Sequence, residues 1–117
     1  MYYYKVKNFR VVDGDTIDAD IDLGFNLTFH RKIRLKDVYA PELSEPMGLE
    51  AMNHLSYLLT EFCFDENKAE PWVQSHGWDK YGRVEGVLYA QGKALKKDLN
   101  ELMRLWLKIR LPIVKKK

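Results

Sequence analysis

The feature that most constrains the fold is an alternation of apolar and polar residues that runs through residues 16–36. One face of its first segment is formed by Ile17, Ala19, Ile21 and Leu23, and the other by Thr16, Asp18, Asp20 and Asp22. Residues 27–36 repeat the alternation, with Arg31 as the one misfit on the apolar face and Arg34 on the polar face. A period of two predicts two half-buried strands. Gly24-Phe25-Asn26 predicts the turn between them.

A third strand is predicted before this pair. Residues 2–12 alternate roughly, and the break in their period at Asn8 indicates a β-bulge. Asp13-Gly14-Asp15 then predicts a tight turn, because glycine tolerates positive φ and an aspartate side chain caps a turn. Three consecutive strands form a meander, whose edges need closure or a covering helix.

The second half of the chain predicts a helix, two strands and a second helix. The first helix is expected over residues 46–61, with Ser44 as its cap and an apolar stripe of Leu49, Met52, Leu55, Leu59 and Phe62. Strands are expected over residues 70–76 and 83–89. Ala90–Lys93 forms a turn into the second helix, which must end before Pro112 and whose stripe is Leu95, Leu99, Leu102 and Trp106. This is the element order of an α+β fold of the OB type, a five-stranded OB-fold β-barrel with a helix between strands 3 and 4 and a C-terminal helix, although the pattern alone leaves it as one of several α+β options.

Length and charge place limits on the kind of protein. The 117 residues suit one domain, so we expect a single domain over residues 1–117 with a basic tail over 106–117. Residues 91–117 hold nine Lys or Arg against two Asp or Glu, which could assist polyanion binding or simply solvate a helix face. No apolar run is long enough to span a membrane, and no signal peptide is evident. The single cysteine, Cys63, excludes an intramolecular disulfide, so a cytoplasmic location is expected.

Three polar clusters suggest a site that handles a phosphate: Asp13–Thr16, Arg34–Glu42 and Asp79–Arg83. Phosphodiester hydrolysis needs a base for water, and a carboxylate such as that of Glu42 can serve. It also needs cations that match phosphate oxygens, for which Arg34 and Arg83 are candidates. Asp15, at a strand–turn junction, is a candidate metal ligand. Each feature alone is typical of a turn or a solvated surface, and only their combination is specific.

The motifs together resemble those of the staphylococcal nuclease (thermonuclease) family, over residues 6–106. The matching segments are Asp13-Gly14-Asp15-Thr16, Arg34 to Glu42, Gly48-Leu49-Glu50-Ala51, Asp79-Lys80-Tyr81-Gly82-Arg83 and Ala90 to Lys93. The resemblance implies an OB-fold nuclease that cuts DNA and RNA with Ca²⁺. It assigns a calcium ligand to Asp15, the general base to Glu42, and phosphate binding to Arg34 and Arg83. Lys80 and Tyr81 would contact the nucleotide.

Tyr39 departs from the family pattern, which has a metal-binding Asp at this position. A phenol is a poor ligand for calcium, which prefers carboxylate and carbonyl oxygens. One hypothesis is that Asp37 replaces the missing ligand, because residues two positions apart in a strand lie on the same face, as Asp37 and Tyr39 would. Asp18 is a second candidate. Alternatively Tyr39 stacks on a base or simply packs, with the metal site weakened or lost. Trp78 is likewise either a stacking residue or a loop anchor.

The resulting expectation is a nuclease that hydrolyses phosphodiester bonds of DNA, RNA or both, acting on single strands with calcium. The alternative is a non-catalytic OB-fold module that binds single-stranded nucleic acid or a protein partner after loss of the metal site.

Overall fold

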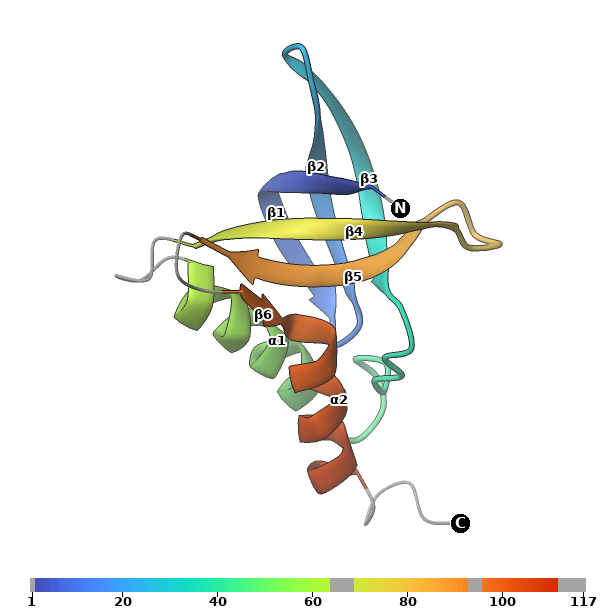
Figure 1. Ribbon diagram of the computed structural model, residues 1–117. Coiled ribbons are helices and arrows are strands. Elements are labelled where there is room, and N and C mark those ends of the chain that lie inside the picture. Colours follow the sequence, from blue (N-terminus) through green and yellow to red (C-terminus); the bar gives the residue numbers. More distant parts are fainter. Residues whose placement is uncertain (1, 64–68, 93–95, 112–117) are drawn as a thin grey trace.

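The sheet closes on itself into a five-stranded barrel, with a sixth strand and two helices added to it (Figure 1). The computed structural model describes residues 2–63, 69–92 and 96–111. The strands are β1 (Tyr3–Asp13), β2 (Thr16–Gly24), β3 (Leu27–Leu35), β4 (Glu70–Trp78), β5 (Val84–Gln91) and β6 (Lys96–Asp98). Their order is β3-β2-β1-β4-β5-β6, and a parallel β3–β5 pairing closes the barrel. This arrangement is compatible with the OB-like α+β fold that the sequence predicts.

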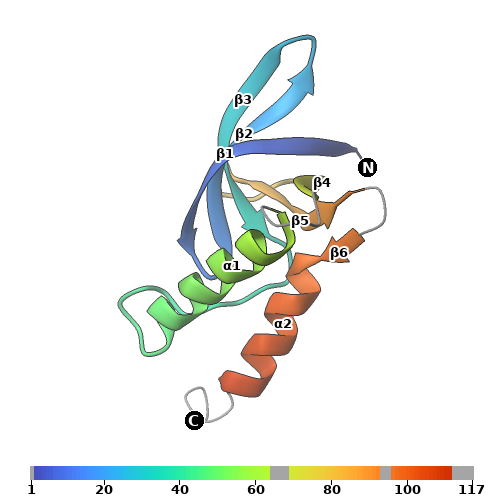
Figure 2. The same ribbon diagram turned by 90° about the vertical axis from the view of Figure 1, so that its left-hand side faces the viewer.

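A bulge in β1 lets one strand serve two partners. Tyr3–Lys5 pairs with β4, whereas the rest of the strand pairs with β2. The register shifts between Lys7 and Arg10, and Asn8 between them has a positive φ of 49°. Figure 2 shows the sharp change of direction along β1. The β-bulge predicted at Asn8 is therefore confirmed, and it is the bend that allows the barrel to close.

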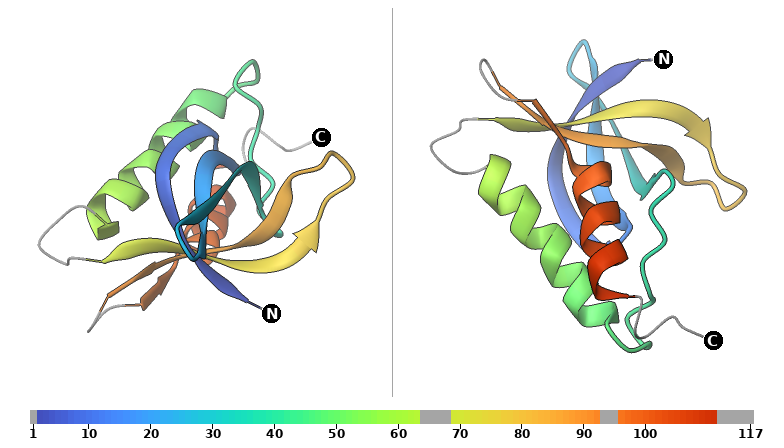
Figure 3. Two further views of the ribbon diagram at one scale, coloured as in Figure 1. Left: turned by 90° about the horizontal axis from the view of Figure 1, so that it is seen from above. Right: turned by 60° about the horizontal axis from the view of Figure 1, so that its bottom comes forward.

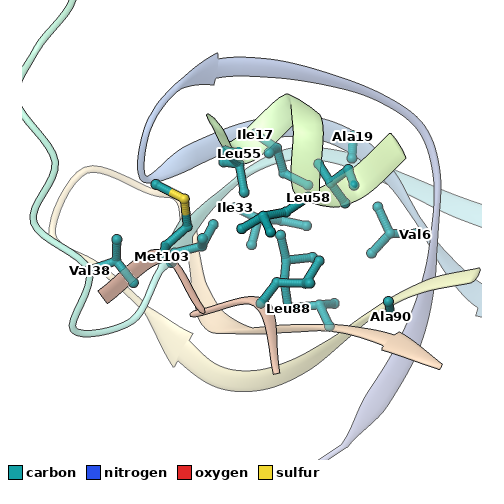
Figure 4. Packing of buried hydrophobic residues seen from close by; sticks show 14 of the residues in the cluster. Val6, Ile17, Ala19, Ile33, Val38, Leu55, Leu58, Leu88, Ala90 and Met103 are labelled. Carbon is teal, nitrogen blue, oxygen red and sulfur yellow. The ribbon is translucent and has the colours of Figure 1, made fainter. Parts of the chain in front are cut away.

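The core fills the barrel and the space beneath it. The largest fully buried apolar side chains are Ile17, Ile33, Leu35, Val38, Leu55, Leu59, Val73, Leu88, Leu99 and Met103 (Figure 4). The apolar face predicted for residues 16–23 is buried as far as Ile21, but Leu23 and Leu27 are exposed. They lie where the β2–β3 hairpin rises beyond the barrel, so these apolar side chains have no second layer to cover them (Figure 1).

Two helices pack side by side below the barrel (Figure 3, right). Helix α1 (Gly48–Cys63) begins two residues later than the sequence predicts, and its buried residues are Gly48, Ala51, Leu55, Leu58, Leu59 and Cys63. The predicted apolar stripe is therefore wrong at its start, since Leu49 is 55% exposed. Ala51 takes the buried position in the first turn instead.

Helix α2 (Leu99–Arg110) follows a strand that the sequence did not predict. Lys96–Asp98 pairs with the edge of β5, so the expected direct turn into a helix is wrong there. Asp98 caps the helix by accepting a hydrogen bond from the backbone N–H of Glu101. The predicted stripe residue Leu95 and residues 112–117 of the expected tail lie outside the described residues. No helix in the described part of the chain is long and apolar enough to cross a membrane.

Candidate functional site

An open cleft of about 530 Å³ brings together residues from all three polar clusters. It is lined by Val12, Asp13, Thr16, Lys32, Glu42, Tyr81 and Arg83. Three of the residues singled out from the sequence, Glu42, Tyr81 and Arg83, therefore share one surface although they come from two loops 39 to 41 positions apart in the chain. Their mixture of carboxylate, guanidinium and phenol suits a polar, anionic ligand.

Asp15 lies behind this cleft and holds its neighbours in place. Its carboxylate accepts hydrogen bonds from the Thr16 hydroxyl and from the backbone N–H of Ala40, both at 3.0 Å. The backbone N–H of Asp15 in turn donates to the side chain of Asp13 at 3.0 Å. Asp13 and Thr16 line the cleft, so Asp15 ties the β1–β2 turn to the segment that leads to Glu42.

Gly14 is required in this turn by packing. A Cβ on Gly14 would lie 2.6 Å from the Ala40 Cβ and 2.7 Å from the Ala51 Cβ, so a side chain there would push the turn away from the core. The expectation that Gly14 supplies positive φ is wrong, because the positive-φ glycines are Gly24, Gly77 and Gly82. The expected aspartate cap is confirmed by the bond from the Asp15 N–H to Asp13.

The carboxyl of Asp15 is only 8% exposed, and its ionisation is correspondingly unfavourable. Burial, the hydrogen bond with Asp13 and the negative charge of Asp13 together raise the pKa of Asp15 to about 6. Arg34 and the N–H of Ala40 act in the opposite direction, but they do not cancel the effect of burial. Asp15 is thus a carboxylate whose charge state can change near neutral pH.

Arg34 is turned toward Asp15, and Tyr39 lies beside it. The guanidinium of Arg34 is 3.5 Å from Asp15 Oδ2 and also donates to the carbonyl of Leu35. Its Cζ lies 5.5 Å from the ring centroid of Tyr39, within cation–π distance. Tyr39 is 66% exposed, so it is not packed in the core. The structure does not place Arg34 among the residues that line the cleft.

Glu42 is held by its main chain while its side chain faces solvent. Its N–H donates to Glu45 Oε1 at 2.7 Å, and the Glu45 N–H donates back to the Glu42 carbonyl at 2.9 Å. Gly48, the first residue of α1, packs against that same carbonyl so closely that a Cβ would overlap it. The start of α1 therefore fixes where Glu42 stands in the cleft.

The loop between β4 and β5 is organised by Asp79. One carboxylate oxygen accepts from the N–H groups of Tyr81 and Arg83, at 2.8 and 2.9 Å, and the other lies 2.6 Å from Arg83 Nε. Desolvation works to raise the pKa of Asp79, but these bonds and the Arg83 charge hold it below its usual value. Tyr81 is flanked by two cations, Lys80 Nζ and Arg83 Cζ, each 5.3 Å from its ring centroid. Arg83 is thus pre-oriented beside Tyr81.

The strand geometry assumed for a replacement of the missing metal ligand is not present. Strand β3 ends at Leu35, and Asp37 is exposed with a φ of +60°, so the expectation that Asp37 and Tyr39 share a strand face is wrong. Asp18 is paired with Arg10 and His30, at 3.5 and 3.1 Å.

Calcium binds six to eight oxygens, several of them anionic. Within residues 2–63, 69–92 and 96–111, no three His, Cys, Asp or Glu side chains form a group that could hold a metal ion. Asp15, the principal candidate, already has both carboxylate oxygens hydrogen-bonded. These residues do not by themselves make a calcium site, and calcium dependence stays a prediction.

Three polar residues of the cleft, Lys32, Thr16 and Asp13, were not predicted as site residues. For the first two the signals were available: Lys32 shares the polar strand face with Arg34, and Thr16 belongs to the Asp13–Thr16 motif. Asp13 was noted only as part of the turn. No protein-family model matches this chain, and the comparison with curated proteins finds no match.

Proposed function

We propose that this chain is a nuclease of the staphylococcal nuclease-like OB-fold type, which hydrolyses phosphodiester bonds in single-stranded DNA or RNA. The observation that supports this function is the shared cleft of Glu42, Tyr81 and Arg83, which Lys32 also lines. A carboxylate and two cations are groups that phosphodiester hydrolysis can use, and an aromatic ring can contact the nucleotide.

In this proposal Glu42 accepts the proton of a water molecule whose oxygen attacks phosphorus. The bond from phosphorus to the leaving oxygen breaks, and that oxygen takes a proton from solvent. Arg83 and Lys32 offset the negative charge that builds on the phosphate, Arg83 with a planar fork and Lys32 as a point charge. Tyr81 and the exposed Lys80 contact the nucleotide.

Arg34 acts from behind the cleft through Asp15. A phosphate and Asp15 would compete for its guanidinium, and protonation of Asp15 would release it. The raised pKa of Asp15, about 6, makes that competition sensitive to pH near neutrality.

A second function is favoured by a separate observation. The ring of Tyr39 lies where an acidic ligand was expected and contacts Arg34 instead, and no three-ligand acidic group occurs in the described chain. These features suit a module that binds single strands by stacking and charge, without cutting them.

One assay separates the two functions. Labelled single-stranded DNA and RNA are incubated with the wild type in calcium, in manganese or magnesium, and in chelator, and cutting and binding are both measured. The nuclease proposal predicts cutting by the wild type and none by Glu42→Gln or Arg83→Ala, with Glu42→Gln still binding. Absence of cutting with every ion, together with binding that survives in chelator and weakens with salt, would establish the binding module instead.

A further inference from the structure

A second pocket is apolar and distinct from the cleft, since the two share no lining residue. It has a volume of about 320 Å³, at the lower end of the ~300–1,000 Å³ that small-ligand sites occupy. Its walls come from all five barrel strands, and include Tyr4, Ile21, Phe29, Val73, Trp78 and Val84. In Figure 1 the long β2–β3 hairpin rises above the barrel, whereas the β4–β5 loop projects to its right.

The lip of the pocket combines aromatic rings with a cation. Trp78 is 59% exposed and meets Phe29 edge-on, with ring centroids 5.8 Å apart. The guanidinium of Arg31 lies 4.3 Å from the Phe29 centroid and 5.9 Å from that of Trp78. Arg31 is the residue that breaks the apolar face of its strand in the sequence, and here it covers these rings. An exposed ring next to a cation suits a flat aromatic group that carries a nearby negative charge.

The apolar pocket and the polar cleft share a wall. Val84 lines the pocket, and the residue before it, Arg83, lines the cleft. In the same way Lys32 lines the cleft, while its neighbour Arg31 lies over Trp78 at the pocket lip. Neighbouring strand residues point to opposite faces, and their Cα atoms are only ~3.8 Å apart. The two sites therefore lie on opposite sides of one wall, and a strand with a phosphate at Arg83 would cross the rim of that wall to place an adjacent unit at the pocket.

We propose that this pocket binds an unpaired nucleobase of the strand whose phosphate lies in the cleft. The base stacks on Trp78 and enters between Phe29 and Val84, while Arg31 neutralises the phosphate next to it. This inference rests on the proposed function and gives a physical reason for its restriction to single strands, because a paired base cannot enter the pocket without breaking its pair. Cations belong to both sites, Arg31 at the lip of the pocket and Lys32 and Arg83 in the cleft, which matches a polyanion and not an apolar partner surface.

The test compares binding of two fluorescent strands of equal length, oligothymidine and an abasic strand, by the full chain in the Glu42→Gln background. The Kd for the abasic strand divided by the Kd for oligothymidine isolates what the bases contribute to affinity. Stacking on one aromatic ring is worth ~1–3 kcal/mol, so Trp78→Ala should lower this ratio by roughly 5- to 150-fold. Trp78→Phe should retain most of the ratio, since it keeps a ring. Tyr57→Ala, which removes an equally exposed ring on α1, should leave it unchanged.

The outcomes keep the two proposals apart. The base pocket is overturned if the Kd ratio is near one in Glu42→Gln with Trp78 intact, or if Trp78→Ala does not alter the ratio. In either case, cutting by the wild type and loss of affinity in Arg83→Ala would still support the nuclease. Failure to bind either strand and failure to cut overturn both. Self-association of the protein that Trp78→Ala abolishes would place a second copy on the pocket and also overturn the inference.

Discussion

At the scale of single residues, the site depends on a carboxylate that is kept out of water. Asp15 joins the β1–β2 turn to Ala40 and pairs with Arg34, and burial makes its charged form costly. The native state therefore binds a proton on Asp15 at pH values where the unfolded chain does not. Stability from this group is fully present below its ordinary pKa of 3.8 and is lost as pH rises through about 6.

Asp15→Asn is accordingly expected to gain stability relative to the wild type between pH 4 and pH 7.5, by roughly 1–3 kcal/mol, because the amide carries no charge to bury, whereas the acceptor it loses has no titration of its own. The difference should shrink as the pH falls to about 4, where the wild-type carboxyl is protonated. Urea unfolding of both proteins at a series of pH values measures it. A difference that stays constant with pH, or grows toward acid pH, would contradict the assignment.

Gly48 gives a second prediction at this scale. Alanine favours helix over glycine by about 1 kcal/mol, yet its Cβ at position 48 would overlap the Glu42 carbonyl. We expect Gly48→Ala to lose about 1–3 kcal/mol of stability. Displacement of Glu42 should also slow cleavage by about 10²-fold. Leu49→Ala, at the exposed neighbouring position, should change neither the free energy of unfolding in urea nor the cleavage rate by much. If the two variants behave alike, Gly48 does not position Glu42.

Sequence reasoning succeeds with residues in motifs and fails where the chain leaves regular structure. Glu42 and Arg83 do share a cleft, as their motifs predict. The position of Asp37 was predicted from strand alternation, but the strand ends at Leu35 and the following backbone turns with positive φ. The contact of Tyr39 with Arg34 carries no signature in the sequence either.

At the scale of elements, Asn100 joins α2 to the barrel. It is fully buried, accepts from the Leu88 N–H at 2.9 Å, and donates to the carbonyls of Lys36 and Gly86, both at 3.1 Å. These partners belong to β5 and to the end of β3, next to the stretch that carries Tyr39 and Glu42. The helix therefore helps to fix the segment on which the site is built.

Asn100→Leu is expected to destabilise the protein by about 1–3 kcal/mol, because it leaves the buried Leu88 N–H without its acceptor, while the carbonyls of Lys36 and Gly86 keep other donors. Arg104→Ala is the matched control, since Arg104 donates to the same Lys36 carbonyl but is exposed. Arg104→Ala should lower the free energy of unfolding by no more than about 0.5 kcal/mol. Chemical denaturation measures both variants, and a similar small loss of stability in both would show that Asn100 does not hold α2 to the barrel.

The larger elements could be predicted because their residues repeat with a clear period. Strands β2 and β3 match their predicted ranges to within a residue or two. Strand β6 was missed because Lys96-Lys97-Asp98 has no apolar alternation. What makes it a strand is the edge of β5, where Tyr89–Gln91 offers backbone partners.

At the scale of the whole molecule, charge is distributed unevenly, and the cleft and the basic C-terminal end are separate candidates for binding a polyanion. Affinity for a single strand should fall with salt, with a log–log slope of about −0.7 for each phosphate neutralised. If the strand lies in the cleft, Arg83→Ala should reduce the magnitude of this slope by about 0.7, and Arg110→Ala on α2 should leave it unchanged. If binding measured at several salt concentrations shows a slope that Arg110→Ala reduces and Arg83→Ala leaves unchanged, the strand binds to α2 and not in the cleft.

The most direct test of the account is the cleavage rate of Glu42→Gln at saturating single-stranded substrate, with binding measured on the same strand. If Glu42 is the base, the rate falls by ~10²–10⁴-fold, while Kd changes by less than about threefold, or ~0.6 kcal/mol. Cleavage by Glu42→Gln at the wild-type rate would contradict the central claim.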